Sequence, residues 1–334
     1  MVHLFETAHA AKLLERYAPK RVIDRALCAA GLDRRILSGL PGFIPYAAEA
    51  VMVETVARSI GDRHLGARLG RDFDYATYGA FASYVLGARD LASAMHRGRR
   101  ALVVTHPGSS IEMRQEEGHL VVGRSTAGLS VVGHRHLDEG ALFVILKSVR
   151  HFAGPDWCPD WVEVPEMRSG DAETLSALIE APVRTGAAMP SIAIGIGDLA
   201  AKNPVWASTR NGVKLQELPD LMGVETSQTM ESSVRQILRV HRPTLDVSEE
   251  AVARYLAISR RSLQRALKSE GTTFREVRAQ AIAERARALL TGSDLGVTMI
   301  AKTLGYDEPK SFRRAFRTWT GMSPADYRAS QKDP

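Results

Sequence analysis

The sequence predicts a mixed fold: an N-terminal α+β domain and a C-terminal all-α domain with two helix-turn-helix units joined by a linker helix. Its 334 residues are enough for two cores of ordinary size. Apolar residues follow both helical and alternating spacing in the first two thirds of the chain, and helical spacing alone afterwards. The expected boundaries are 1–210 for the first domain, 211–232 for the linker and 233–334 for the second domain.

Positive charge is concentrated in the second domain. Residues 230–334 contain 19 Lys and Arg against 12 Asp and Glu, which leaves +7. Residues 1–229 contain 25 against 26, which leaves −1. A basic module joined to a near-neutral one indicates that the basic module meets a polyanion.

Composition excludes several classes of protein. Hydrophobic residues make up 45% and charged residues 25%, as in ordinary globular proteins. The only cysteines are Cys28 and Cys158, which favours a reducing compartment and predicts neither a disulfide framework nor a zinc site. The N-terminus lacks a signal-peptide pattern, and the longest apolar runs are too short to span a bilayer. We therefore expect a cytoplasmic protein with no membrane partner, no metal and no cofactor.

The first domain shows both helical and strand patterns. Helical spacing predicts short helices within 7–69 and a helix or helix pair within 78–104, which ends in a basic cluster at 96–100. Alternation predicts an antiparallel hairpin from Ser110, with its turn at Glu116 to Gly118, and a third strand that reaches His136. The remaining predicted elements are a helix at 138–151 and strands at 161–164 and 191–196.

The first helix-turn-helix unit is predicted within 246–271. Asp246 or Ser248 caps its first helix, Ile258 and Ser259 form the turn, and the second helix runs from Ser259 to Glu270. At 100° per residue the second helix separates an apolar arc of Leu263, Ala266 and Leu267 from a polar arc. The polar arc contains Arg260, Arg261, Gln264, Arg265 and Lys268.

The same arrangement recurs some fifty residues later. Phe312, Ala315, Phe316 and Trp319 share one arc of a second helix. The opposite side holds the candidate contacts Lys310, Ser311, Arg313, Arg314 and Arg317. Arg and Gln suit bidentate contacts with guanine and adenine in the major groove, and Lys suits phosphate. A solvated charged face is the alternative for one such helix taken alone, but two helices with the same separation favour double-stranded DNA as the partner.

A linker helix is predicted between the two units. Thr273 and Glu276 form a capping box, and the helix runs to about Leu290 before Gly292 ends it. Its length of about 25 Å sets the two recognition helices roughly one duplex turn, about 34 Å, apart. One chain is therefore expected to read two adjacent half-sites.

Residues 246–328 resemble the DNA-binding domain of the AraC/XylS family of bacterial regulators. The resemblance is carried by three segments: 300–306 (IAKTLGY), 311–317 (SFRRAFR) and 321–328 (GMSPADYR). By position it implies base contacts near Arg261, Gln264 and Arg265, and near Lys310, Arg313 and Arg314. The sequence departs from the family at Ala257, where Gly is common, and at Gln280 and Ala281, where an Arg is frequent.

Residues 1–210 resemble, more loosely, the effector-binding and dimerisation domain of one branch of this family. The similar segments are 59–62, 64–70 and 81–91. The resemblance implies a small organic effector, a homodimer and, as a further partner, RNA polymerase. Tyr84, His134 and His136 are the candidate effector contacts. The expected function is a transcription regulator and not an enzyme; both activation and repression stay open.

Two other functions stay open at this point. One is a DNA-binding regulator without an effector, whose first domain only dimerises. The other is an alkyl-accepting DNA-repair regulator that uses Cys158, although no clustered cysteines accompany that thiol. His134 and His136 are expected on one face of a strand, but no partner at a recognisable ligand spacing supports a metal site there.

Overall fold

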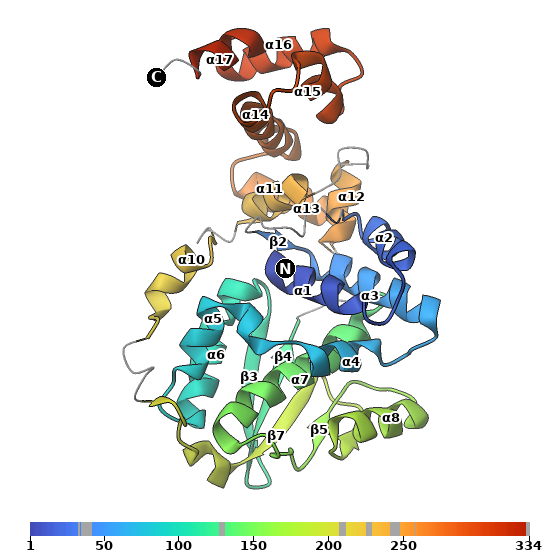
Figure 1. Ribbon diagram of the computed structural model, residues 1–334, viewed down its shortest axis with the longest axis vertical. Coiled ribbons are helices and arrows are strands. Elements are labelled where there is room, and N and C mark those ends of the chain that lie inside the picture. The colour runs from blue at the N-terminus through green and yellow to red at the C-terminus, as the bar shows by residue number, and fades with distance from the viewer. Residues whose placement is uncertain are drawn as a thin grey trace. The chain divides into compact units, whose positions relative to one another are not determined.

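The computed structural model divides the chain into two compact units, Met1–Thr226 and Ser227–Pro334 (Figure 1). This division lies within the segment 211–232 that was predicted as the linker. The structure describes residues 1–32, 34, 42–126, 131–206, 212–224, 229–240, 248–256 and 258–331. None of the helices in these ranges is both long and apolar enough to cross a membrane.

Helices fill the first part of the N-terminal unit, as the spacing predicts. They are α1 Leu4–Leu14, α2 Lys20–Ala29, α3 Tyr46–Ile60, α4 Leu65–Asp72, α5 Ala80–Leu86 and α6 Leu91–Thr105. The basic cluster at 96–100 lies inside α6 and not at its end. A short sheet of β1 Val2–His3 and β2 Phe43–Ile44 was not predicted. Two residues are too few to show alternation, so only their pairing defines them.

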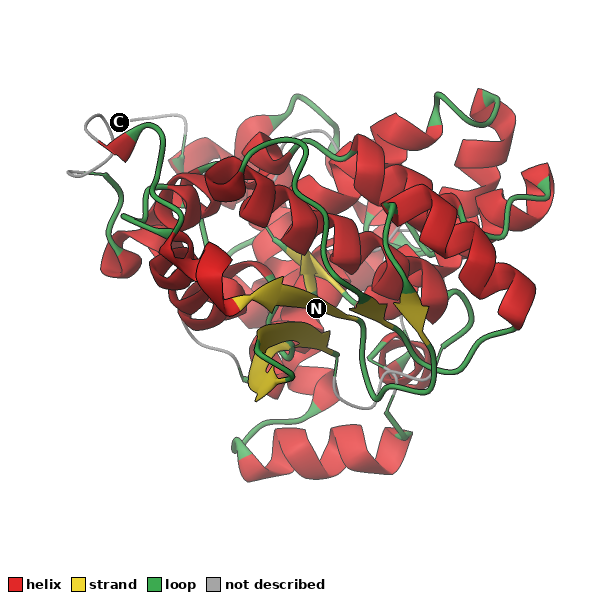
Figure 2. Ribbon diagram, turned by 90° about the horizontal axis from the view of Figure 1, so that it is seen from below, coloured by secondary structure: helices red, strands yellow, loops and turns green. Residues whose placement is uncertain are grey.

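A five-stranded sheet forms the rest of the core, in the order β3-β4-β7-β5-β6. Figure 2 shows that helices make up most of the chain and that the strands gather in one region. The hairpin of β3 Ser110–Glu116 and β4 His119–Ser125 is confirmed, with Glu117 and Gly118 at positive φ in its turn. The strands β5 Val162–Glu163 and β7 Ser191–Gly195 confirm the two later predictions. The last strand, β6 Val183–Arg184, is parallel to β5.

The third strand predicted to reach His136 is wrong, because α7 His134–Ala153 begins there. The helix follows Gly133, whose φ of 87° favours glycine and whose added Cβ would lie 2.3 Å from the Ala50 carbonyl oxygen. The His-Arg-His run at 134–136 was predicted to place both imidazoles on one face of a strand, but it forms the first turn of a helix. The helix packs on α6 and β7.

Close approach of two backbones fixes α7 against α4. An added Cβ at Gly66 would lie 2.2 Å from the carbonyl oxygen of His136. One at Gly70 would lie 2.9 Å from Cα of Gly140. Glycine is therefore required on α4 for this crossing. Beyond α7, α8 Ser169–Ile179 packs against α4, and short turns and α10 Leu218–Leu221 complete the unit.

The C-terminal unit is helical throughout its described residues. Its helices are α11 Met230–Val240, α12 Glu249–Tyr255, α13 Arg260–Ser269, α14 Phe274–Gly292, α15 Val297–Thr303, α16 Pro309–Thr320 and α17 Pro324–Ser330. The predicted all-α architecture with two helix-turn-helix units and a linker helix is confirmed. The core around α16 contains an aromatic group, with Phe312 and Phe316 fully buried near Tyr306, Trp319 and Tyr327, beside aliphatic residues of α14 and α15.

Candidate nucleic-acid interface and interior cavity

Two serine side chains cap the helices of the first helix-turn-helix unit. Ser248 Oγ accepts a hydrogen bond from the Ala251 amide at 3.1 Å, and Ser259 Oγ accepts one from the Ser262 amide at 3.0 Å. Asp246, the other candidate cap, lies outside the described residues. Leu263 and Leu267 are 0% and 1% exposed, so the apolar arc of α13 faces the core as predicted.

The polar arc of α13 is exposed, but its residues differ in their partners. Arg260 Nε lies 2.7 Å from Glu249 Oε2, and Gln264 Nε2 donates to the same oxygen at 2.9 Å. Arg261, Arg265 and Lys268 are exposed and make no side-chain hydrogen bond or ion pair with other described residues. The carboxylate of α12 therefore fixes two of the five candidate side chains and leaves three free.

The second unit presents a similar basic arc, but no carboxylate among the described residues holds its side chains as Glu249 holds Arg260 and Gln264. Pro309 occupies the first turn of α16, where a missing N–H costs nothing, and Gly321 ends the helix at φ 75°. Lys310, Arg313, Arg314 and Arg317 are exposed, and Ser311 is half-buried. Within the described ranges, the four basic side chains have no hydrogen-bonding or ionic partner. Four cations on one surface suit the phosphates and bases of nucleic acid.

The linker helix α14 begins with the predicted capping box. Thr273 N–H donates to Glu276 Oε2 at 2.8 Å, and the Glu276 amide donates to Thr273 Oγ1 at 3.3 Å. Its 19 residues span about 28 Å. Gln280 accepts a bond from Arg235 on α11 at 3.4 Å, and Ala281 is buried. These two departures from the family pattern thus face α11 and the core, respectively.

One contact of α13 was missed by sequence reasoning. Glu270, just after α13, accepts hydrogen bonds from the amides of Met230 and Glu231 at 2.6 and 2.8 Å. Its carboxylate therefore caps the N-terminus of α11, where a negative charge is favourable. The cap comes from 39 residues away, so no local signal reveals it.

Two adjoining cavities lie inside the N-terminal unit, each with a volume of about 60 Å³. Both are lined by Arg124, Ala141 and Val144. The first lobe is otherwise largely apolar, with linings that include Tyr78, Phe81, Val85, Met95 and Leu102. The second lobe adds the carboxyl groups of Glu6 and Glu49. Charged side chains inside an apolar cavity are typical of a small-molecule site.

Burial controls the charges of these groups. Burial, reinforced by the charge of Glu6, raises the pKa of Glu49 to about 8, so this carboxyl is largely protonated at neutral pH. His106 Nε2 lies 2.9 Å from Glu6 Oε2, and burial lowers the pKa of His106. Sequence reasoning missed this cluster, because its members come from α1, α3, β4 and the end of α6.

The three candidate effector contacts lie in different places. His136 lines the second cavity, but its Nδ1 accepts from the Gly66 amide at 3.2 Å and its Nε2 lies 3.0 Å from Glu54 Oε2. Burial lowers the pKa of His136, which favours the neutral ring that both contacts require. His134 contacts Thr126 at 2.9 Å, and Tyr84 packs under the Arg97 guanidinium. Neither is among the described residues that line the two cavities.

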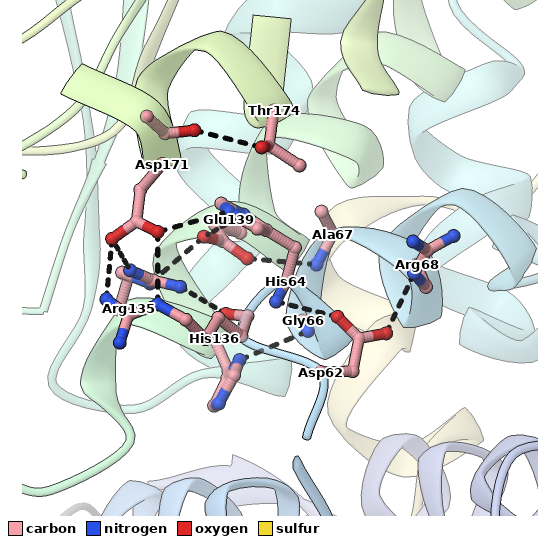
Figure 3. A network of polar contacts seen from close by, with 12 residues as sticks. Asp62, His64, Gly66, Ala67, Arg68, Arg135, His136, Glu139, Asp171 and Thr174 are labelled. Carbon is pink, nitrogen blue, oxygen red and sulfur yellow. Dashed lines mark hydrogen bonds and ion pairs between the residues drawn. The ribbon is translucent and has the colours of Figure 1, made fainter. Parts of the chain in front are cut away.

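A buried polar network next to the cavity ties α4, α7 and α8 together. Figure 3 shows Asp171, Arg135, Glu139 and His64 pointing toward one another. Asp171 Oδ2 lies 2.8 Å from Arg135 Nη1, and His64 Nδ1 lies 3.0 Å from Glu139 Oε1. Glu139 is fully buried and also accepts from the Ala67 amide at 3.3 Å. Apart from His64 Nε2, which has no hydrogen-bond partner and lies 3.7 Å from Asp171 Oδ1, these groups contact protein, so the network holds helices together.

Cys158 is exposed, and its Sγ lies 3.6 Å from Arg150 Nη2. Across the ranges that the structure describes, no three His, Cys, Asp or Glu side chains group in a way that would hold a metal ion.

Comparison with known proteins agrees with this arrangement in both units. Residues 22–202 match the family described as the arabinose-binding domain of AraC transcription regulators, N-terminal. Residues 252–330 match a helix-turn-helix domain family.

Two curated relatives align with the C-terminal region. The HTH-type transcriptional regulator VqsM of Pseudomonas aeruginosa is 46% identical over 78 residues, 23% of this chain and 24% of that protein. The ornithine utilization regulator of the same species is 39% identical over 108 residues, 32% of each. The chain thus aligns with only about a quarter to a third of the length of these relatives.

Among solved structures, the crystal structure of the transcriptional regulator CdpR from Pseudomonas aeruginosa is 22% identical with a TM-score of 0.41. The alignment covers 97% of this chain and 96% of that one. The N-terminal family match alone extends over more than half of the 334 residues. The chain therefore belongs to the AraC family of transcription regulators.

Proposed function

We propose that the protein is a transcription regulator that binds specific sites on double-stranded DNA through α13 and α16. The observation that carries this proposal is the pair of helices, each with an exposed basic arc over a buried apolar one. The net charge of +7 on residues 230–334 supports it. Arg261, Gln264 and Arg265 on α13, with Lys310, Arg313 and Arg314 on α16, are the proposed base contacts; Arg260, Lys268, Ser311 and Arg317 complete the surface.

The test starts from full-length protein and a pool of random duplexes, from which bound sequences are selected. We expect one enriched sequence motif with two half-sites and an affinity that falls steeply with salt. The variant Arg265→Ala/Arg314→Ala should lose this discrimination. The control is Arg275→Ala/Arg278→Ala, which removes the same charge from exposed positions of α14. No enrichment by the wild type, or equal losses in both double variants, would contradict the proposal.

We further propose that a small organic effector bound inside the N-terminal unit controls this activity. The match to an arabinose-binding domain family and the charged interior cavity support this role. An effector acts only if its affinity differs between two states of the protein. Ligand-dependent thermal stabilisation, together with a ligand-dependent change in transcription from a selected promoter, separates this function from a regulator without an effector.

We propose that the N-terminal unit also forms a homodimer, since paired chains gain avidity for repeated sites without new base contacts. Sedimentation equilibrium at micromolar concentration tests this, and a strict monomer both free and on DNA would contradict it. Contact with RNA polymerase stays a prediction. Methyl transfer to Cys158 is not expected; mass spectrometry after exposure to methylated DNA checks it.

A further inference from the structure

Arg124 is a buried cation at the boundary between the two cavity lobes. We propose that this cavity binds a small carboxylic acid with an apolar body, whose carboxylate pairs with Arg124 and whose hydrocarbon part fills the first lobe. The inference rests on the proposed effector control and assigns the chemical class of that effector.

The side chain of Arg124 is short of partners. The residue lies on β4 and is 9% exposed. Its Nη2 has one long bond, 3.4 Å to the Leu137 carbonyl oxygen, and its Nε has no hydrogen-bond partner. No ion pair found among the described residues includes Arg124, and the ring of Tyr46 lies 5.4 Å from its guanidinium carbon. A buried guanidinium with unused donors suits a planar carboxylate, which can accept two bonds at once.

The acidic groups nearby do not take this place. Glu6 Oε2 lies 2.9 Å from His106 Nε2, and Asp138 Oδ1 lies 3.3 Å from His134 Nε2. Burial opposes the charge of Arg124, and the nearby charges of Glu6 and Asp138 help to raise its pKa, but neither carboxyl forms one of the ion pairs found among the described residues with its guanidinium. Glu49 lines the second lobe, but its raised pKa of about 8 leaves it largely uncharged at neutral pH. The guanidinium therefore keeps hydrogen-bond donors that no described carboxyl accepts, and we expect the carboxylate of a ligand to accept them.

The apolar lobe selects the rest of the ligand. Tyr78, Phe81, Val85 and Met95 line it from one side, and Ile111 and Val122 line it from the sheet. A sugar would leave its hydroxyl groups without partners there, whereas an alkyl or aryl group would not. The volume of about 60 Å³ for each lobe favours short acids.

The experiment titrates full-length protein with straight-chain carboxylates from acetate to octanoate, and with benzoate, by calorimetry. Each acid is paired with its uncharged amide. We expect at least one acid to bind about tenfold or more tightly than its amide, since a charge-assisted bond contributes that much. The inference is overturned if no acid in the series binds, or if acid and amide bind equally well.

Two variants localise the binding. Arg124→Gln, shown to be folded by circular dichroism, should lose the preference for the acid over the amide, and Arg124→Lys should keep part of it. Gly98→Ala places a methyl group in the first lobe, where the nearest atom is Ile111 Cδ1 at 3.8 Å. Alanine also has a higher helix propensity than glycine, and position 98 lies in the interior of α6. This variant should therefore melt at a higher temperature while binding the acid more weakly.

These variants also separate the two proposals. A folded Arg124→Gln protein that keeps the preference for the acid contradicts the inference. If Arg124→Gln does not fold, unchanged affinity in Gly98→Ala contradicts it instead. Binding of the selected duplex is measured on the same preparations. If the wild-type protein binds the selected duplex but none of the carboxylates, this inference is wrong and the proposed function stands. If the wild-type protein binds no duplex, the proposed function is wrong.

Discussion

The two units treat their charged residues in opposite ways. In the N-terminal unit Glu49, His106, Arg124 and Glu139 are inside the fold, where each needs a partner or a shifted pKa. In the C-terminal unit the arginines and lysines of α13 and α16 are outside, over cores of leucine or phenylalanine. A buried charge interacts strongly and selectively with a ligand at short distance, because the protein interior has a low dielectric constant. Exposed positive charges attract a polyanion over longer distances. The difference matches the two ligands proposed above.

The largest effect is expected when a buried charge loses its partner. Glu139→Ala removes the carboxylate that Arg135 and His64 contact, and should lower the free energy of unfolding by about 3–5 kcal/mol. Glu173→Ala, at an exposed position of α8 in the same unit, is the control and should change it by less than about 0.5 kcal/mol. Urea denaturation of both variants measures the difference. If both variants lose the same small amount of unfolding free energy, buried charge is not important for the stability of the N-terminal unit.

Acid should also affect the N-terminal unit more than the C-terminal one. Burial lowers the pKa of His3 from 6.5 to about 4, and burial lowers the pKa of His106 and His136. Because the unfolded chain binds these protons first, stability is lost as pH falls from 6.5 toward 4, by about 3 kcal/mol for His3 alone. The described residues of the C-terminal unit contain no histidine.

Thermal melts between pH 7 and pH 4 check this expectation. Glu49 acts in the opposite direction, because its raised pKa means that the folded state binds its proton more tightly. Glu49→Gln should therefore make the loss on acidification steeper. If the melting temperatures of the wild type and of Glu49→Gln do not change with pH, the interior of the N-terminal unit does not contain these titrating groups in the described state.

On the C-terminal surface, single exposed arginines should affect binding and not folding. Arg265→Ala or Arg314→Ala should weaken the selected duplex by about 1–3 kcal/mol and relax sequence preference. Lys268→Ala should weaken all duplexes alike. Anisotropy titrations on selected and scrambled duplexes, with a melt for each variant, test this.

Leu267→Ala and Phe316→Ala should instead destabilise the C-terminal unit, by about 2–5 kcal/mol, because these side chains are buried. The same melts measure this loss.

The smallest effect concerns the ion pair between Arg260 of α13 and Glu249 of α12. Glu249→Gln weakens the clamp on Arg260 and Gln264, and should reduce discrimination between duplexes by less than about 1 kcal/mol. Glu250→Gln removes the same charge from the same helical turn without touching the clamp. Both variants should bind scrambled DNA slightly better. If they also discriminate equally well, the clamp does not position the reading side chains.

Sequence reasoning found what repeats or lies close along the chain. The cap at Ser248, one of two candidates, the capping box at Thr273, the turn before α13, the hairpin turn and the buried arcs of α13 and α16 all depend on neighbours within a few residues. It failed where distant segments meet: the pairing of Val2 with Ile44, the start of α7 at His134, and the cavity around Arg124. The polar run at 134–136 was ambiguous, since both the first turn of a helix and an exposed strand can consist of polar residues.

The cap that Glu270 provides has a mechanical consequence. Met230 and Glu231 are the first residues of α11, and their amides are tied to the residue that follows α13. A pull on the chain just before Met230 therefore loads two hydrogen bonds at the base of the recognition helix. Tension from the preceding segment therefore reaches the end of α13 directly through these two bonds, and it reaches α14 through the packing of α11 and the bond from Arg235 to Gln280.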